Sequence, residues 1–284
     1  MLTSVVLFST MDSAVKWYGA TYPTQQIMFF RCVVAIFPVS IFLLNAGGFR
    51  LLKTSRPVLH LLRSMIGLVA MGCAFYGFTL IPLAEASAVF YTAPLLAVLI
   101  SIPVLGEQVG LRRWTAVVLG LAGALIVIRP GFGLFGIGAA FMFAAALAVA
   151  ITTNIIRLLG QTDDPACIAF YFTLSGSVVS TLLCLWFGWV TPSLNDLVGL
   201  IGIGVLGGCA QYTMTLAYRL SQIGMVAPLK YLSIVAGSVL GYLIWSELPD
   251  PISLSGMTII IATGIYTIRR EVKLAKPDIP APQD

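Results

Sequence analysis

The chain has 284 residues, of which 59% are hydrophobic and only 10% are charged, and its formal net charge is +5. A soluble domain carries roughly 25% charged residues, so this composition excludes an ordinary water-soluble protein and predicts a chain embedded in a lipid bilayer. The basic excess lies mainly beside the apolar runs and gives no reason to expect a nucleic-acid partner.

Apolar runs separated by proline, glycine and charged residues predict ten membrane-spanning helices. A helix needs about 20 apolar residues to cross the hydrocarbon core. The first run has no basic region ahead of it and contains Asp12 and Lys16, so it is interpreted as a span and not as a cleaved signal peptide. The predicted spans are 2–18, 25–45, 58–80, 84–105, 113–129, 134–157, 166–188, 195–218, 225–246 and 252–268.

Basic residues are distributed unevenly between the two sides of this topology. Eleven of the 16 lysines and arginines fall on one side, and only Lys16 and Arg129 fall on the other. Because basic loops stay in the cytoplasm, both termini are expected there. Residues 271–284, rich in proline, are expected to form a disordered cytoplasmic tail. Three basic residues remain inside spans: Arg31, Arg63 and Lys230.

The two halves of the chain repeat each other weakly at an offset of 140 residues. This offset aligns Tyr91 with Tyr231 and Glu107 with Glu247. Both glutamates close an interfacial helix end, where they are expected to brace the helix and not to couple ions. Five spans per half is an odd number, so the sequence predicts an all-α membrane protein whose ten transmembrane helices form two inverted five-helix repeats, the architecture of alternating-access carriers. The predicted repeats are 1–131 and 132–270.

Three segments of the chain carry a family resemblance. They are TLIPLAEASAVFYTAPLLAVLISIPVLGEQVGLRRWTAVVLGLAGALIVIRPG at 79–131, its weaker echo AYRLSQIGMVAPLKYLSIVAGSVLGYLIWSELPD, and DSAVKW followed by FFR. Through them the chain resembles the drug/metabolite transporter superfamily, especially its ten-helix EamA-type exporters of amino acids and aromatic metabolites. The resemblance implies a ten-helix carrier in a bacterial inner membrane that moves small metabolites, often outward, without ATP. It does not fix the substrate.

A substrate site is predicted between the fourth and ninth spans. The repeat makes Tyr91 and Tyr231 symmetry mates about two turns into these spans. Lys230 follows Pro228, and a cation between aromatic rings suits the carboxylate of a small zwitterion or organic anion. Alternatively, Lys230 reaches the cytoplasmic headgroups. The predicted substrate-binding residues are Tyr91, Lys230, Tyr231, Trp17, Tyr76 and Gln211.

A second set of charges lies in the first three spans. Charged groups inside hydrocarbon cost about 2.5–3.5 kcal/mol each on insertion scales, so they are expected to have partners. Asp12 and Lys16 are four residues apart, in the favourable order for an ion pair within one helix. The other interpretation makes Asp12 an ion-coupling acid or a substrate contact. Arg31 and Arg63 are expected either to extend toward the headgroups or to pair with Asp12.

These patterns favour a secondary carrier that exports small metabolites, above all amino acids, as a monomer or homodimer without a cofactor. Carriers of nucleosides, nucleotide-derived cofactors or drugs remain alternatives within the same fold. A membrane enzyme is a remote alternative, because no catalytic set or metal cluster can be assembled around His60, the only histidine. The five cysteines are scattered singly, so neither a disulfide framework nor a metal site is expected.

Overall fold

The computed structural model describes residues 1–90, 92–105, 136–220 and 232–274, together with a few positions between 115 and 126. Every regular element in these ranges is a helix, and no strand occurs in them. Five helices in the described part are long and apolar enough to cross a membrane, which confirms a helical membrane protein. They are Thr24–Ala46, Pro57–Leu80, Ile137–Leu159, Pro165–Phe187 and Leu194–Ala217.

The helices coincide with the predicted spans wherever the chain is described. The span predicted at 113–129 and the start of the ninth span lie largely outside the described residues, as does 275–284 of the predicted tail. The last helix continues past the predicted end at 268. The elements are α1 Leu2–Gly19, α2 Thr24–Val33, α3 Ile36–Ala46, η1 Gly48–Leu52, α4 Pro57–Leu80, α5 Leu83–Phe90, α6 Ala93–Leu105, α8 Ile137–Leu159, α9 Pro165–Phe187, α10 Leu194–Leu220, α12 Leu232–Trp245 and α13 Pro251–Leu274.

Two of the predicted spans are interrupted near a proline. The helical pattern is interrupted at Val34 and Ala35 between α2 and α3, a few residues before Pro38. A second interruption separates α5 from α6 at Thr92, just before Pro94. Proline has no backbone N–H and its ring clashes with the preceding turn, so a helix bends or breaks there. Both interruptions therefore follow from the nearby proline.

Local capping explains where several helices begin. Pro165 occupies the first position of α9, where a missing N–H costs nothing. The carboxylate of Asp164 accepts a hydrogen bond from the Ala166 backbone N–H at 2.9 Å and so satisfies one of the free donors of that first turn. Asp250 does the same for α13, accepting from the Ile252 N–H at 2.9 Å. Both α9 and α13 thus start at an Asp-Pro pair.

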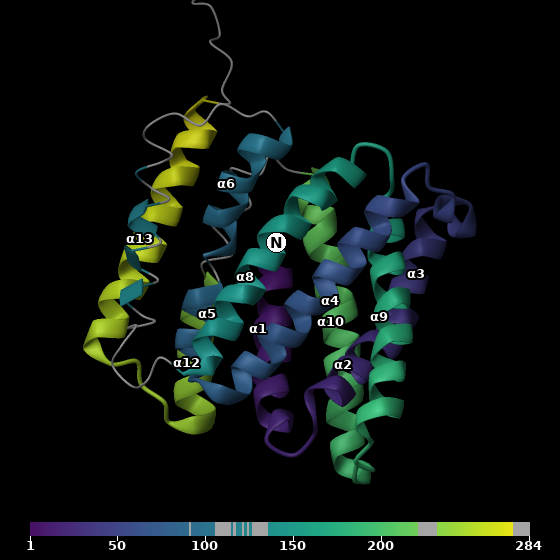
Figure 1. The fold of residues 1–284 in the computed structure, drawn as a ribbon, viewed down its shortest axis with the longest axis horizontal. Helices are drawn as coiled ribbons and strands as arrows, with labels where there is room; N and C mark the ends of the chain where they lie inside the picture. The colour runs from purple at the N-terminus through teal and green to yellow at the C-terminus, as the bar shows by residue number, and fades with distance from the viewer. Residues whose placement is uncertain are drawn as a thin grey trace, which may run out of the picture.

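Helices from both halves of the chain interleave. In Figure 1, α2, α3, α9 and α10 lie on one side, α5, α6, α12 and α13 lie on the other, and α1, α4 and α8 lie between them. The most extensive packing joins α4 to α8, α1 to α10 and α2 to α9. Each of these contacts joins one helix before residue 131 to one helix after it, so residues of both halves build the main hydrophobic core.

Glycines allow α10 to approach α2 and α3 closely. A side chain at Gly204 would overlap Val34 and the carbonyl oxygen of Phe30. A side chain at Gly208 would lie 2.8 Å from Cγ of Pro38. This Gly-xxx-Gly spacing therefore lets α10 pack closely against its neighbours.

Candidate functional site

Lys16 forms an ion pair between helices and not within its own helix. Its ammonium group donates to both carboxylate oxygens of Glu247, at 2.7 and 2.6 Å, and lies 4.8 Å from the centroid of the Trp245 ring. The same carboxylate accepts a hydrogen bond from the Leu83 backbone N–H at 3.4 Å. Glu247 therefore braces a helix end, as predicted. The predicted pairing of Lys16 with Asp12 is wrong, because an acid 231 residues away packs closer to the ammonium.

Arg31 and Arg63 meet inside the bundle. The two arginines are only 2% and 4% exposed. Their guanidinium carbons lie 5.6 and 3.8 Å, respectively, from the centroid of the same ring, that of Phe172. Nη2 of Arg31 donates to the carbonyl oxygen of Gly207, midway along α10, at 3.2 Å. The expectation that these arginines extend to the headgroups is therefore wrong. Spacing along one helix did not reveal that a neighbouring helix covers them.

The alternative expectation, pairing with Asp12, is also not met. The described carboxylates form no ion pair with either guanidinium, and Asp12 attracts Arg31 only from a greater distance. Cation–π contact with a desolvated ring contributes about 2 kcal/mol, against an insertion cost of about 2.5–3.5 kcal/mol for each charge. One ring shared by two cations leaves part of that cost uncompensated.

Several nitrogens of the arginine pair have no hydrogen-bond partner among the described residues. They are Nη1 of Arg31 and both Nε and Nη1 of Arg63. One turn beyond Gly207 on α10, Gln211 is buried and its Nε2 also has no described partner. Buried donors without acceptors are rare in folded proteins and call for an explanation.

The structure describes three of the six predicted substrate-binding residues and places them beside different neighbours. Trp17 is 57% exposed, and its ring centroid lies 6.3 Å from that of Trp245. Tyr76 is partly exposed and contacts Phe141 edge to face, with centroids 4.9 Å apart. Gln211 alone is buried. The other three, Tyr91, Lys230 and Tyr231, lie outside the described residues.

Polar residues on α8 join it to α6. Nδ2 of Asn154 donates to the carbonyl oxygen of Ala97 at 3.0 Å and to that of Ala150 at the same distance. Thr153 donates to the carbonyl oxygen of Val149, within its own helix, at 2.8 Å. Asn154 is therefore an interhelical hydrogen-bond donor.

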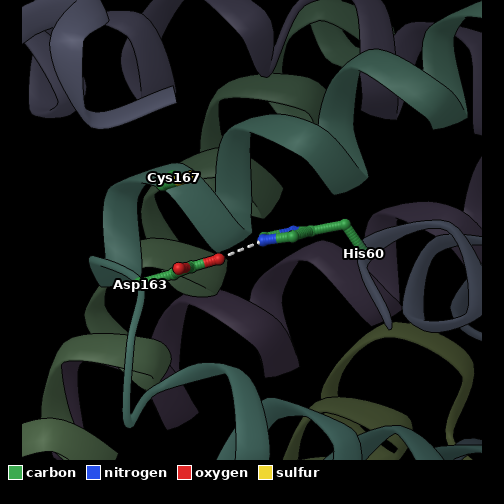
Figure 2. Close-up of side chains that lie close together, drawn as sticks. All are labelled: His60, Asp163 and Cys167. Carbon is green, nitrogen blue, oxygen red and sulfur yellow. Dashed lines mark hydrogen bonds and ion pairs between the residues drawn. The ribbon is translucent and has the colours of Figure 1, made fainter. Parts of the chain in front are cut away.

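A buried polar cluster at the start of α4 has no counterpart among the sequence predictions. Nε2 of His60 lies 2.6 Å from Oδ2 of Asp163, which also accepts a hydrogen bond from Thr54 at 2.6 Å. Figure 2 shows His60 reaching from α4 toward Asp163, with Cys167 on the first turn of α9. No spacing motif links His60 to Asp163, because they are 103 residues apart. Only the packing of α4 against α8 and α9 brings them together.

This cluster works as a hydrogen-bonded junction between two loops. Burial raises the pKa of Asp163, but hydrogen bonds from Thr54, His60 and Thr162 and the charge of His60 outweigh it and hold the pKa below its ordinary value. Nearby, the Tyr171 hydroxyl donates to the carbonyl oxygen of Leu52 at 2.7 Å. One potential metal-ligand atom from each of His60, Asp163 and Cys167 lies within 4.8 Å of the other two, a spacing that could hold a metal ion. The existing bonds of Asp163 already account for the arrangement.

Comparison with known proteins gives consistent matches over almost the whole chain. The sequence model of the EamA-like transporter family matches residues 1–129 and 136–269. An S-adenosylmethionine uptake transporter of Rickettsia prowazekii is 27% identical over 272 residues, which cover 96% of this chain and 92% of that protein. The pseudopaline exporter of Pseudomonas aeruginosa is 30% identical over 264 residues, which cover 92% of both chains.

Two further similarities agree with these. A riboflavin transporter of Vibrio cholerae is 24% identical over 280 residues, which cover 97% of this chain and 94% of that protein. A solved crystal structure matches the fold with a TM-score of 0.70 and 23% sequence identity, covering 96% of each chain. The fold is therefore one already seen by crystallography.

Proposed function

Because the chain belongs to the EamA-like transporter family of the drug/metabolite transporter superfamily, and is thus a membrane transporter, we propose that it is a secondary carrier that exports amino acids or closely related small metabolites. The names of its relatives indicate transporters and not enzymes. Export is favoured by the pseudopaline exporter, which at 30% is more identical to this chain than the R. prowazekii uptake transporter.

Gln211 is the observation that carries this proposal. It lies in α10, within an apolar helix long enough to span the membrane, yet it is buried and its Nε2 has no described partner. An unpartnered buried amide destabilises a folded chain by about 1–3 kcal/mol. A carrier explains the cost, because a polar substrate passing through the bundle supplies the missing acceptor.

The proposed mechanism is alternating access between two inverted five-helix repeats, residues 1–131 and 132–270, ten helices in all. Two separate family matches, over 1–129 and 136–269, support a chain built from two related halves. The uneven distribution of basic residues supports cytoplasmic termini in a bacterial inner membrane. Residues 271–284 are proposed to be cytoplasmic, and 271–274 of them continue α13.

The proposed substrate site is the one predicted from the repeat. Tyr91 and Tyr231 form its walls, Lys230 binds the substrate carboxylate, and Gln211 adds an amide donor, with Trp17 and Tyr76 nearby. Asp12 and Lys16 belong to the surrounding charged groups. A zwitterion suits this set, because a cation fixes its acid group while the rings cover its apolar part.

A second candidate substrate class is cofactor-like metabolites. It is favoured by relatives named as S-adenosylmethionine and riboflavin transporters, which cover nearly the whole chain. These two substrates differ widely in chemistry, so the relatives support a small-metabolite carrier more strongly than any single compound.

Counterflow in proteoliposomes tests the proposal. The panel contains amino acids, nucleosides, riboflavin and quaternary amines, each measured with and without a pH gradient. Amino acids are expected to exchange, and Lys230→Met and Tyr91→Ala are expected to reduce that exchange at least tenfold. The matched controls are Lys53→Met and Tyr242→Ala at exposed positions. Exchange of nucleosides or amines alone would reject amino acids as substrates, and unchanged exchange in both variants would reject the site.

A further inference from the structure

The arginine pair, Arg31 and Arg63 on the ring of Phe172, has hydrogen-bond donors that the described residues leave without acceptors. We propose that the two guanidinium groups bind the carboxylate of an organic acid inside the membrane. The proposed acid site uses none of the residues Tyr91, Lys230 and Tyr231. The inference rests on the proposed function only where it makes the bound acid a transported one.

Charge balance inside the bundle is the first argument. Two guanidinium groups are buried there, and Asp12 is the described acid that lies well inside a span. One carboxylate cannot neutralise two cations, and a charge in hydrocarbon needs a partner. A bound anion completes the balance. The other described acids lie at helix ends or in loops: Glu85, Asp163, Asp164, Asp196, Glu247, Asp250 and Glu271.

The unused donors are the second argument. Arg31 directs Nη2 to the Gly207 carbonyl oxygen, and this leaves its Nη1 without a described partner. Arg63 has no described partner at Nε or at Nη1, which lie on different edges of its guanidinium group. Each is a charged donor, and a carboxylate oxygen is the strong acceptor that arginine commonly binds.

Glycines beside the pair keep its guanidinium groups closely surrounded. A side chain at Gly67 would lie 3.0 Å from Cε2 of Phe172 and 3.4 Å from Nη1 of Arg63. A side chain at Gly207 would lie 3.0 Å from Nε of Arg31. A larger residue at Gly207 would therefore crowd Arg31, and one at Gly67 would crowd the Phe172 ring while only touching Arg63.

A purely structural role fits these arginines poorly, as comparison with Gln26 shows. Gln26 is fully buried, and its amide exchanges two hydrogen bonds with the backbone of Val190, at 2.7 and 2.9 Å. The chain thus satisfies a buried structural amide at both ends. Among the described residues it leaves three donors of Arg31 and Arg63 free beside a single aromatic ring, as a ligand site requires.

Binding of benzoate to the purified full-length protein tests the inference. Benzamide, planar and of the same size but neutral, is the matched ligand, and sodium chloride keeps the ionic strength constant. Benzoate is expected to raise the midpoint of thermal unfolding in a saturable manner, whereas benzamide is not. Equal shifts from both ligands, or no shift from benzoate, would overturn the proposal.

Variants assign the binding to the arginine pair. Arg63→Gln is expected to lose at least ten-fold in benzoate affinity, and Arg50→Gln, at an exposed position in η1, to lose none. Arg63→Lys keeps the charge but not the planar fork, so it serves if Arg63→Gln fails to fold, and it is expected to bind several-fold more weakly than the wild type. Unchanged affinity in a folded Arg63 variant would contradict the proposal.

Counterflow then separates this inference from the proposed function. If the bound acid is transported, Arg63→Gln should remove the preference for an amino acid over its amide, while Lys230→Met lowers exchange of the amino acid itself. Benzoate binding that depends on Arg63, in a protein that exchanges no amino acid, would reject the proposed function and leave the acid site standing. Amino-acid exchange without benzoate binding would do the reverse.

Discussion

The ammonium group of Lys16 lies 2.6 Å from a carboxylate oxygen of Glu247, so the end of α1 is joined to the segment that follows α12. Both side chains are partly buried, 10% and 31% exposed, and hydrogen bonds to charged groups there stabilise by about 1.5–3 kcal/mol. Lys16→Met and Glu247→Gln are each expected to lower the midpoint of thermal unfolding in detergent.

A double-mutant cycle isolates this ion pair. The double variant should lose less stability than the two single variants together, with a coupling energy of about 1 kcal/mol or more. Strict additivity would show that the two residues do not stabilise each other.

Glu247→Gln should leave any pH dependence of counterflow unchanged, because we expect Glu247 to brace a helix end and not to carry a coupled proton. The same result is expected of Glu107→Gln.

Asp163 is expected to stabilise the junction between the two loops only while it is ionised. Its pKa is lower in the folded chain than its ordinary value, so its contribution is fully present above the ordinary pKa of an aspartic acid and is lost as the pH falls through the lowered value. Asp163→Asn should therefore lower the free energy of unfolding at pH 7 by about 1.5–3 kcal/mol and lower the unfolding midpoint with it. The difference in midpoint between this variant and the wild type should shrink in acid.

The neighbouring Asp164 provides the control for Asp163→Asn. Asparagine caps a helix about as well as aspartate, so Asp164→Asn should change the midpoint little. A difference between Asp163→Asn and wild type that stays constant from pH 7 down to pH 3 would show that the charge of Asp163 does not matter.

Alanine substitutions at Gly204 and Gly202, both in α10, are expected to have opposite effects on stability. A methyl group at Gly204 overlaps Val34 and the Phe30 carbonyl oxygen, and overpacking costs about 1–3 kcal/mol. A methyl group at Gly202 meets nothing within 4 Å. Gly204→Ala should lower the unfolding midpoint by several degrees, and Gly202→Ala should leave it unchanged or raise it. Equal midpoints would argue against the close approach of α10 to α2.

Membrane topology can be checked at two exposed loop serines. Single cysteines at Ser55 and Ser193 should react with a membrane-impermeant maleimide from opposite faces, Ser55 from the cytoplasm. The unmodified protein, whose five native cysteines are buried or half-buried, measures the background labelling. Reaction of both positions from the same face would refute the predicted arrangement of spans.

Hydropathy predicted the helices well, because the cost of leaving backbone polar groups unpaired in hydrocarbon makes long apolar runs helical. Pro38 and Pro94 marked their interruptions for a similarly local reason. Partner choice was less predictable. Asp12 is four residues from Lys16, yet Glu247 takes that ammonium group, since neighbours in a bundle depend on how distant helices pack.

The partners of the candidate site residues were also hard to predict from the sequence. The spacing of Arg31 and Arg63 within their spans suggested side chains reaching the headgroups, whereas the ring they share belongs to α9, more than 100 residues further along the chain. The amino-acid sequence nevertheless contains a signal: two arginines and one aspartate inside the first three spans leave an excess of positive charge. Such an imbalance of charge within hydrocarbon is itself an indication of an anion-binding site.

The interleaving of the two halves affects how the protein is made. Arg31 and Arg63 enter the bilayer with the first helices, but Phe172 and Gly207 follow only after more than a hundred further residues. At about 5–20 residues per second this delay is on the order of ten seconds. During that interval the nascent first half has two arginines in the membrane without their final neighbours, so lipid headgroups, water or the insertion machinery must shelter them until α9 and α10 arrive.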